Sequence, residues 1–400
     1  MILRDKIRET VNLLRAEMKR CFVCREKSGA KRHILIVRLD GIGDFFIWLP
    51  DAVALQAYYA DAEVTLLANC LWSEAAEKLL SVDRVIPFNP QLFLKDFNYR
   101  IGLLTQLRRK GFDVILQPRF SREFLVEDMI TRWCAAPQSI AFRSDQRSIN
   151  PRLMPWSDHW YTDLVVLPEE IKNEKLINGF WTKKITKNKQ NNGLDSSNTA
   201  ISLDFSCLSA LPEKWISKPY YLIIPGAADP RRRWPPEKLA EVAVLLRQRS
   251  SLRGIICGSR EDRAAAAVIM KKVCDESFLD ITGKTRIIQL IALIGKAQFL
   301  VGNDTGAMHI AVSCGVNAFC ILGGGQWGRF LPYPAKTEWM PDCIYHKMDC
   351  YNCNWQCIYF RELDEPYPCV NAVSVANVDT VLKEMENKKL WKLEGNIKYL

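Results

Sequence analysis

The residues Gly302–His309 (GNDTGAMH) bring an acid, a hydroxyl and two glycines together directly after a short apolar run, Phe299–Val301. The apolar run predicts a buried strand, and the residues that follow the loop predict a short helix. Asp304 and Thr305 are both suitable helix N-caps, and Gly306 lets the backbone bend where a side chain would obstruct it. A helix that begins here directs unpaired N–H groups and its positive dipole end outward, which favours a bound phosphate. The alternative is an ordinary strand-to-helix turn.

An arginine triplet, Arg231–Arg233, lies in the loop after another apolar run, Tyr221–Ile224. Guanidinium groups keep their charge and bond two phosphate oxygens at once, so the loop suits phosphate. The alternative is that these are exposed arginines on a basic protein. Further along, Glu261 or Asp262 follows a Gly-Ser turn after a strand-like run. One of these acids can reach a ribose hydroxyl, or both can simply cap the next helix.

The stretch Arg38–Asp44 (RLDGIGD) joins an expected strand, His33–Val37, to an expected helix that runs to about Tyr59. This order of strand, glycine loop and helix is typical of α/β domains that bind nucleotides or sugars at the carboxyl ends of their strands. It is not the dinucleotide fingerprint, because the third glycine is absent. Asp40 and Asp44 lie on the loop, where a carboxylate can face a cleft. Alternatively, Asp44 is only the N-cap of the helix.

Two arginines, Arg119 and Arg122, directly follow another expected strand, Phe112–Gln117. The end of a parallel strand is a cleft position, so either side chain is a candidate for contact with an acidic acceptor. Alternatively, both are surface charges.

Five of the fourteen cysteines gather near the C-terminus, whereas the other nine are scattered and do not form a disulfide framework. The spacing C-x-x-C-x-x-x-C, with a further cysteine beyond, is compatible with a structural zinc or an iron–sulfur cluster. It is not a standard zinc ribbon, and local packing or labile disulfides are the alternative. The cysteines of this candidate structural site are Cys350, Cys353, Cys357 and Cys369, and Cys343 precedes them.

Composition limits the class of protein. The chain has 400 residues and a net charge of +10, without an apolar run long enough to span a membrane or a secretory signal, so we expect it to remain inside the cell. Residues 1–32 hold ten Lys/Arg against four Asp/Glu, a net charge of +6. Apolar residues recur there at helical spacing, which predicts a basic amphipathic helix. Such a helix lies on an anionic membrane surface or packs onto the first domain.

Alternating strand-like and helix-like segments predict an α/β protein with two or three domains. The segment from Lys172 to Ala200 is polar and basic and predicts a flexible insertion or linker. The expected organisation is an N-terminal extension over residues 1–30, a first domain over 31–215 with the insertion or linker at about 172–210, and a second domain over 216–375. This second domain includes the cysteine-rich segment 343–369, and a C-terminal helix follows over 376–400.

Three motifs occur in one order: R-L-D-G-I-G-D, then P-G-A-A-x-x-R-R-R-W-P from Pro225 to Pro235, then G-N-D-T-G-x-x-H. Together they resemble glycosyltransferase family 9, the ADP-heptose:lipopolysaccharide heptosyltransferase family, from about His33 to about Leu382. The resemblance implies the GT-B architecture, in which two Rossmann-like domains face each other across a cleft. The N-terminal half would bind the acceptor and the C-terminal half the nucleotide sugar, and the last helix would cross back to the first domain.

The resemblance also implies roles for individual residues. Asp44 matches the proposed general base, Arg232 a basic position that contacts the donor diphosphate, and Glu261, more loosely, an acid near the donor ribose. Arg232 stands where lysine is common, and Ala227 and Ala228 stand where some members have hydroxyl residues. The loop that contacts the donor sugar and phosphates is matched by Asp304, Thr305, Gly306 and His309.

The implied activity is inverting transfer of a sugar, expected to be a heptose, from an ADP-heptose type donor to a lipopolysaccharide core or related glycolipid. No cofactor or catalytic metal is expected. Since a secretory signal is absent, we expect the enzyme in the cytoplasm, and a basic N-terminal helix on the anionic surface would bring it into peripheral contact with the inner membrane. One alternative is a nucleotide-sugar-binding protein without transferase activity. Another is a nucleic-acid-associated protein that uses the basic N-terminus, but no recognition motif supports a nucleic-acid partner.

Overall fold

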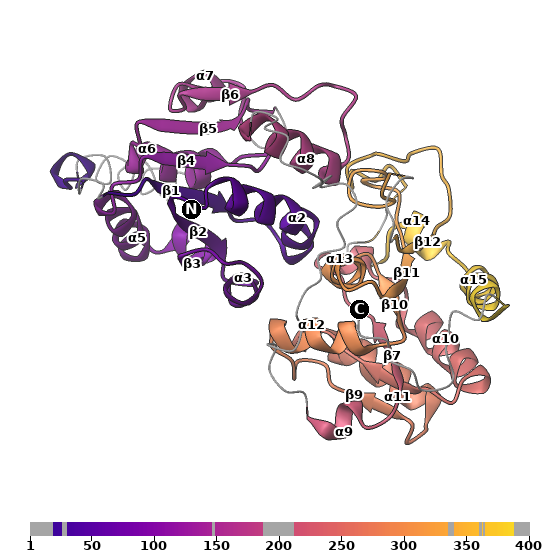
Figure 1. Ribbon diagram of the computed structural model, residues 1–400. Helices are drawn as coiled ribbons and strands as arrows, with labels where there is room; N and C mark the ends of the chain where they lie inside the picture. The colour runs from indigo at the N-terminus through magenta and orange to yellow at the C-terminus, as the bar shows by residue number, and fades with distance from the viewer. Residues whose placement is uncertain are drawn as a thin grey trace. The chain divides into compact units, whose positions relative to one another are not determined.

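The computed structural model describes residues 19–25, 30–145, 149–186, 212–334, 340–359, 362 and 365–387. The chain divides into two compact units, shown in Figure 1. The first comprises Met1–Gly41, Asp51–Ile171 and Leu176–Leu194, and the second comprises Ile42–Pro50, Lys172–Lys175 and Asp195–Leu400. Two short segments, Ile42–Pro50 and Lys172–Lys175, therefore group with the second unit, although their neighbours in sequence belong to the first.

The first unit is built on a six-stranded parallel sheet in the order β3-β2-β1-β4-β5-β6. β1 pairs with β2 and with β4, so the strand order reverses direction between β1 and β4. That pair is the topological switch point, where ligands bind in open α/β sheets. The strands are β1 (His33–Arg38), β2 (Glu63–Asn69), β3 (Arg84–Phe88), β4 (Val114–Gln117), β5 (Gln138–Phe142) and β6 (Asp163–Val165).

Helices cover this sheet because its strands are apolar on both faces. Residues 34–38 of β1 and all of β4 are buried. Leu35 and Val37 of β1 pack into a core with Leu104 and Leu107 of α5 and Ile130 of α6. The helices are α2 (Ile42–Tyr58), α3 (Ser73–Leu79), α4 (Pro90–Lys95), α5 (Phe97–Arg109), a π-helical turn η1 (Phe124–Asp128), α6 (Met129–Cys134), α7 (Met154–Asp158) and α8 (Glu174–Ile185).

The second unit repeats the design with the strand order β12-β11-β10-β7-β8-β9, again all parallel. Here the order reverses between β7 and β10, so the loops after these two strands are the predicted ligand position. The strands are β7 (Tyr220–Ile224), β8 (Arg253–Ile256), β9 (Phe278–Asp280), β10 (Phe299–Asn303), β11 (Asn317–Ile321) and β12 (Asp342–Ile344).

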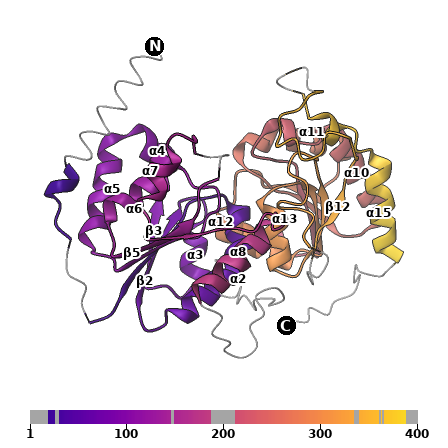
Figure 2. The ribbon, with the colours of Figure 1, turned by 90° about the horizontal axis from the view of Figure 1, so that it is seen from above.

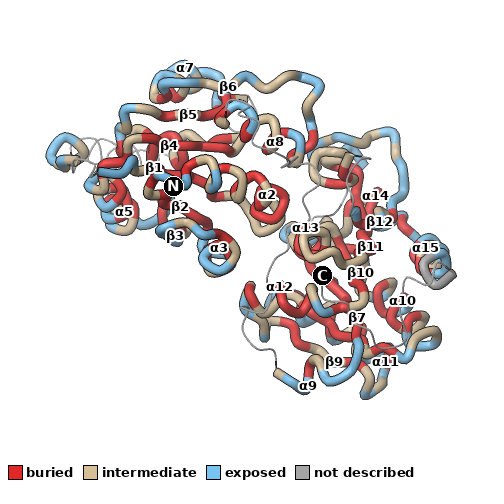
Figure 3. The backbone as a smooth tube through the Cα atoms, in the orientation of Figure 1, coloured by how far each residue is buried: buried red, intermediate tan, exposed pale blue. Residues whose placement is uncertain are grey.

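The core of the second unit follows the alternation of these strands. Tyr221, Phe299 and Phe319 lie on one face, and Tyr221 and Phe299 stack with their ring centres 5.0 Å apart. The buried strands are red in Figure 3, and Figure 2 shows α15 beside α10. The helical segments are α9 (Glu213–Ile216), η3 (Pro230–Arg232), α10 (Pro236–Arg249), η4 (Arg260–Asp262), α11 (Arg263–Val273), α12 (Ile287–Lys296), α13 (Gly306–Ser313), α14 (Pro368–Asn371) and α15 (Val375–Asn387).

The structure corrects the expectation of a flexible insertion from residue 172. Glu174–Ile185 forms helix α8, in which Ile177 and Trp181 are buried one turn apart. The Trp181 ring packs on Phe142, with ring centres 4.8 Å apart. This apolar stripe is narrow and lies between lysines, so the composition of the segment hid it. Residues 187–210 of the same prediction lie outside the described part.

Each end of the described chain packs within its own unit. Arg25 donates to Ala135 O at 2.8 Å and to Phe112 O at 2.7 Å, which fixes residues 19–25 on the first unit. Val378 and Leu382 of α15 lie in the core of the second unit. Most of the predicted N-terminal helix, and residues 388–400 of the predicted crossing helix, lie outside the described residues. No helix in the described part is both long enough and apolar enough to cross a membrane.

The close approach of β10 to β7 generates a stability prediction. A Cβ on Gly302 would lie 2.2 Å from Ile224 O, a backbone atom that only a shift of the strand can move. We expect Gly302→Ala to lower the free energy of unfolding by about 2–3 kcal/mol, measured by urea denaturation. Gly102→Ala in α5 is the matched control, because a Cβ there meets nothing within 4 Å. The free energy of unfolding of the control should rise by about 0.5–1 kcal/mol. Equal decreases in the free energy of unfolding of both variants would contradict the packing argument.

Candidate active site

The loops after β7 and β10 are joined by one buried side chain, Asn303, the last residue of β10. Its amide donates to Pro225 O at 2.6 Å, and its Oδ1 accepts from Trp234 N at 2.9 Å. Asn303 is completely buried, so these bonds fix the ends of the arginine loop against the β10 loop. Sequence reasoning missed Asn303. The available signal was a polar residue at the end of a strand that is otherwise apolar or glycine.

Arg232 bridges the two loops. Its Nη2 donates to Asp304 Oδ2 at 2.5 Å, and its guanidinium lies 4.7 Å from the centre of the Trp355 ring. The side chains of Arg232 and Asp304 are 23% and 14% exposed, so the pair is accessible at the surface of the unit. The structure thus brings together two of the residues that the motifs singled out, at the predicted switch point.

The two flanking arginines have carboxylate partners of their own. Arg231 pairs with Asp229 at 2.8 Å, and Arg233 lies 3.6 Å from Asp262. The hydrogen bond from Arg231 holds the pKa of Asp229 below its usual value. Arg232 is therefore the member of the triplet that reaches the β10 loop.

The helix α13 begins at the predicted position. Thr305 is the N-cap, and its hydroxyl accepts a hydrogen bond from Ala307 N at 3.3 Å. Gly306 is the first helical residue, and a Cβ there would lie 3.1 Å from Gly43 N. The first turn therefore has no side chain at this position, and backbone N–H groups at a helix start bind anions.

The acids Glu261 and Asp262 have separate roles. Asp262 is buried and caps the turn η4, accepting from Ser259 N at 2.8 Å. A Cβ on Gly226 or Gly258 would lie within 2.6 Å of its carboxylate, so both loops need glycine here. Glu261 is exposed, and hydrogen bonding to Ser259 lowers its pKa. Glu261 is thus the acid that can contact a ligand.

His309 is buried on α13, and its Nδ1 lies 2.5 Å from Tyr333 Oη. Burial lowers the pKa of His309 from 6.5 to about 4, an effect that Asp304 opposes only partly. The imidazole is therefore neutral near pH 7 and contributes no positive charge to the site. It packs and orients the first turns of α13.

Asp44 lies in the first turn of α2, in the segment that groups with the second unit. Its neighbour Gly43 approaches α13 closely: a Cβ on Gly43 would lie 2.7 Å from His309 Cδ2 and 3.4 Å from Gly306 Cα. Asp44 is one of the charges that raise the pKa of Tyr333, after burial and Asp304. The structure therefore places Asp44 in the neighbourhood of the predicted donor loop.

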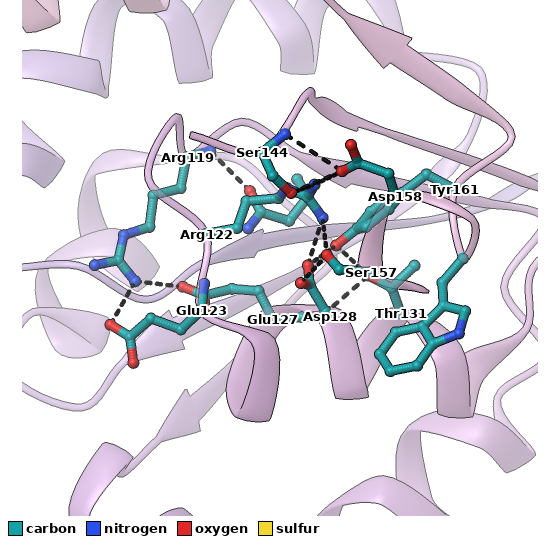
Figure 4. Close-up of polar contacts among 12 residues, drawn as sticks. Arg119, Arg122, Glu123, Glu127, Asp128, Thr131, Ser144, Ser157, Asp158 and Tyr161 are labelled. Carbon is teal, nitrogen blue, oxygen red and sulfur yellow. Dashed lines mark hydrogen bonds and ion pairs between the residues drawn. The ribbon is translucent and has the colours of Figure 1, made fainter. Parts of the chain in front are cut away.

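Asp40 and Arg119 lie at the switch point of the first unit. Asp40 pairs with the buried Arg38 at 3.0 Å. Arg119 donates to Glu127 Oε1 at 2.6 Å and to Glu123 Oε1 at 3.1 Å, as Figure 4 shows. Burial opposes the charge of Arg119, but Glu127 and then Asp40 outweigh it, so the pKa of Arg119 is raised. Its side chain remains 24% exposed and can contact a ligand.

Arg122, in contrast, is completely buried. It donates to Asp128 Oδ1 at 2.6 Å and to Ser144 Oγ at 2.5 Å, and it also bonds Asp158. Asp128 is the last residue of η1, Ser144 follows β5 and Asp158 is the last residue of α7, so Arg122, in the loop after β4, links these three segments (Figure 4). A group without exposed surface does not contact an acceptor, and the structure gives Arg122 a structural role instead.

The candidate structural metal site of the cysteine cluster is not formed among the described residues. All four candidate thiols are free, and Cys369 Sγ accepts from Gly324 N at 3.4 Å. Burial raises the pKa of Cys350 and Cys369, and the neighbouring thiols of the cluster raise it further. Among the described residues, no three His, Cys, Asp or Glu side chains are arranged to hold a metal ion.

The sequence was compared with known families. The model for glycosyltransferase family 9 (heptosyltransferase) matches residues 100–354, more than half of the chain. The chain belongs to glycosyltransferase family 9. It is therefore a glycosyltransferase, as the three motifs predicted.

Individual relatives agree with this assignment. The lipopolysaccharide core heptosyltransferase OpsX of Haemophilus influenzae is 25% identical over 313 residues, which cover 76% of this chain and 82% of OpsX. The solved E. coli ADP-heptose lipopolysaccharide heptosyltransferase II has a TM-score of 0.64 at 17% identity, covering 89% of this chain and 99% of that one. E. coli WaaC with ADP-2-deoxy-2-fluoro heptose has a TM-score of 0.64 at 16% identity, with 88% and 99% coverage. The predicted α/β fold with two Rossmann-like units, the GT-B class, is thereby confirmed.

The buried His309 predicts a pH-dependent stability. Its folded pKa of about 4 lies below the ordinary 6.5, so the unfolded chain binds the proton more readily. The contribution of neutral His309 to the free energy of unfolding is therefore complete above about pH 6.5. It is lost as the pH falls toward 4, and about 2 kcal/mol of it is lost by pH 5. Urea denaturation at pH 7.5 and 5 should show a smaller pH effect for His309→Gln than for the unsubstituted protein. Identical pH effects would contradict the assignment.

Proposed function

We propose that this glycosyltransferase moves a heptose-type sugar from an ADP-linked donor to a lipopolysaccharide core or related glycan, with inversion at the anomeric carbon. The observation that carries the proposal is the meeting of Arg232, Asp304 and the start of α13 at the β7/β10 switch point. The names of the relatives supply the sugar and the acceptor, since OpsX is a lipopolysaccharide core heptosyltransferase and WaaC was solved with an ADP-heptose analogue.

On the donor side, the diphosphate would lie between the Arg232 guanidinium and the first turn of α13. Arg232 offers a permanent charge, and the Thr305–Gly306 turn offers backbone N–H groups and a positive dipole end. Both would stabilise the negative charge that develops on the leaving ADP. The exposed carboxylate of Glu261, beyond β8, is suited to the ribose hydroxyls. His309, being neutral, would hold the turn rather than the phosphates.

Asp44 would act as the general base. The acceptor hydroxyl attacks the anomeric carbon and gives its proton to the Asp44 carboxylate. A new carbon–oxygen bond forms there, the bond to the phosphate oxygen breaks, and ADP leaves with the electron pair. One carboxylate and one stabilised leaving group are sufficient for this displacement, and the proposal assigns no metal to it.

On the acceptor side, Asp40 and Arg119 would recognise the glycan at the β1/β4 switch point. The surroundings of Arg119 contain two carboxylates, Glu123 and Glu127, so one positive charge faces two negative ones. This acceptor site would therefore favour the hydroxyl groups of a glycan over a phosphate group. We also propose that the enzyme acts on the cytoplasmic face of the inner membrane, where the basic residues 1–32 would meet anionic lipid.

Asp44→Asn tests the base directly. The amide keeps the size of the side chain but does not accept the proton, so kcat should fall at least 100-fold. The Kd for ADP, measured by calorimetry, should stay within about twofold, because the proposed phosphate contacts are unchanged. Exposed Asp61→Asn is the charge-matched control and should retain full activity. Normal turnover in Asp44→Asn would refute the assignment of the base.

A further inference from the structure

The indole of Trp355 lies against the guanidinium of Arg232, 4.7 Å from its central carbon to the ring centre. Trp355 belongs to the cysteine-rich segment, more than a hundred residues further along the chain. We propose that Trp355 is a positioning residue that holds Arg232 in the orientation needed to bind the donor diphosphate. The inference rests on the proposed role of Arg232 in the donor site.

Arg232 keeps most of its hydrogen-bonding capacity for a ligand. Its hydrogen bonds within the described residues come from Nη2, to the carboxylate and main-chain oxygen of Asp304. Its Nε is buried without a partner among those residues. An aromatic face attracts a cation without using any of its N–H groups, whereas a second carboxylate would occupy two of them. Trp355 can therefore fix the guanidinium plane and leave Nη1 for phosphate oxygens.

The backbone around Trp355 is in an unusual conformation. Asn352, Asn354 and Trp355 all adopt left-handed angles, with φ of 67°, 50° and 63°. Left-handed angles are unfavourable for residues with a side chain, so three within four positions need compensating contacts. Asn352 N and Asn354 N donate at 2.8 Å to the carbonyls of Gly324 and Gly325. This unusual backbone is explained if the segment must hold the Trp355 ring against the guanidinium of Arg232.

The glycine run Gly323–Gly325 makes room for the ring. A Cβ on Gly325 would lie 2.3 Å from Trp355 Cδ2, and one on Gly324 would lie 2.1 Å from Tyr351 Cδ1. Neither ring could lie where it does if the glycine carried a side chain. The glycine-rich stretch after Leu322, to which the sequence motifs gave no role, therefore accommodates both rings, and Trp355 is the one that reaches the arginine loop.

A second stacked pair reinforces the first. Arg231 lies 5.1 Å from the Tyr367 ring, and the Tyr367 and Trp355 rings are 5.1 Å apart. Tyr367 N also donates to Arg231 O at 2.7 Å, which joins the two segments through the main chain. Two consecutive arginines thus rest on two adjacent rings. Arg231 is engaged with Asp229, so Trp355 is the ring that serves the proposed phosphate ligand.

Calorimetric titration with ADP, and with adenosine as the phosphate-free probe, tests the inference. Trp355→Leu keeps apolar bulk but removes the aromatic face, so we expect the Kd for ADP to rise about 5- to 30-fold with little change for adenosine. Trp355→Phe restores a ring and should recover most of the affinity. Trp327→Ala is the matched control, because Trp327 packs on Tyr345 and Tyr351 in the same region, at 4.4 and 5.3 Å.

The positioning role of Trp355 and the donor-binding role of Arg232 are tested by different variants. Unchanged ADP affinity in Trp355→Leu, or equal weakening in Trp327→Ala, overturns the role of Trp355. Failure of Trp355→Phe to recover affinity also overturns it, because a ring face would then not be the operative feature. If Arg232→Ala leaves the Kd for ADP unchanged, the proposed donor role of Arg232 fails, and with it the foundation of the inference.

Discussion

The close approach of β10 to β7 is the constraint on which the candidate site depends. Gly302 permits this approach because any side chain would meet Ile224 O, and Asn303 then bonds both ends of the arginine loop. These contacts set where Asp304 and the start of α13 lie relative to Arg232. A parallel sheet that reverses its strand order at this pair leaves the two loops adjacent at its carboxyl edge. Backbone packing thus sets the position of the proposed phosphate site, and the charged side chains complete it.

Arg122 of the first unit and Arg232 of the second have different roles, because they differ in how far they are buried. Arg122 is buried and must satisfy its charge with Asp128 and Asp158, so it stabilises the loops around it. Arg232 is partly exposed, has one carboxylate, and rests on an aromatic face that consumes no hydrogen bond. One arginine is therefore a structural cross-link and the other retains donors for an anionic ligand, although both lie in loops that follow central strands, β4 and β7.

The sequence predicted the features that depend on local pattern. The strand, loop and helix over 299–313 were predictable because apolar runs, an N-cap and a glycine stop are adjacent in the chain. The buried, structural role of Arg122 was not predictable, because its partners lie up to 36 residues away in the sequence. Helix α8 was hidden by lysines around a narrow apolar stripe, and the contact of Trp355 with Arg232 joins segments that share no periodic signal. The roles of Asp44, Arg119 and Glu261 remain predictions.

The central claim is that donor phosphates bind at the β7/β10 switch point. Hydrogen–deuterium exchange of the full chain with and without saturating ADP tests it most directly, because it reports every backbone amide at once. We predict that ADP slows exchange in residues 225–234 and 303–308, while the loops after β5 and β6 are unaffected. Protection confined to the first unit's β1/β4 loops, or absent from both predicted segments despite measurable ADP binding, would contradict the account.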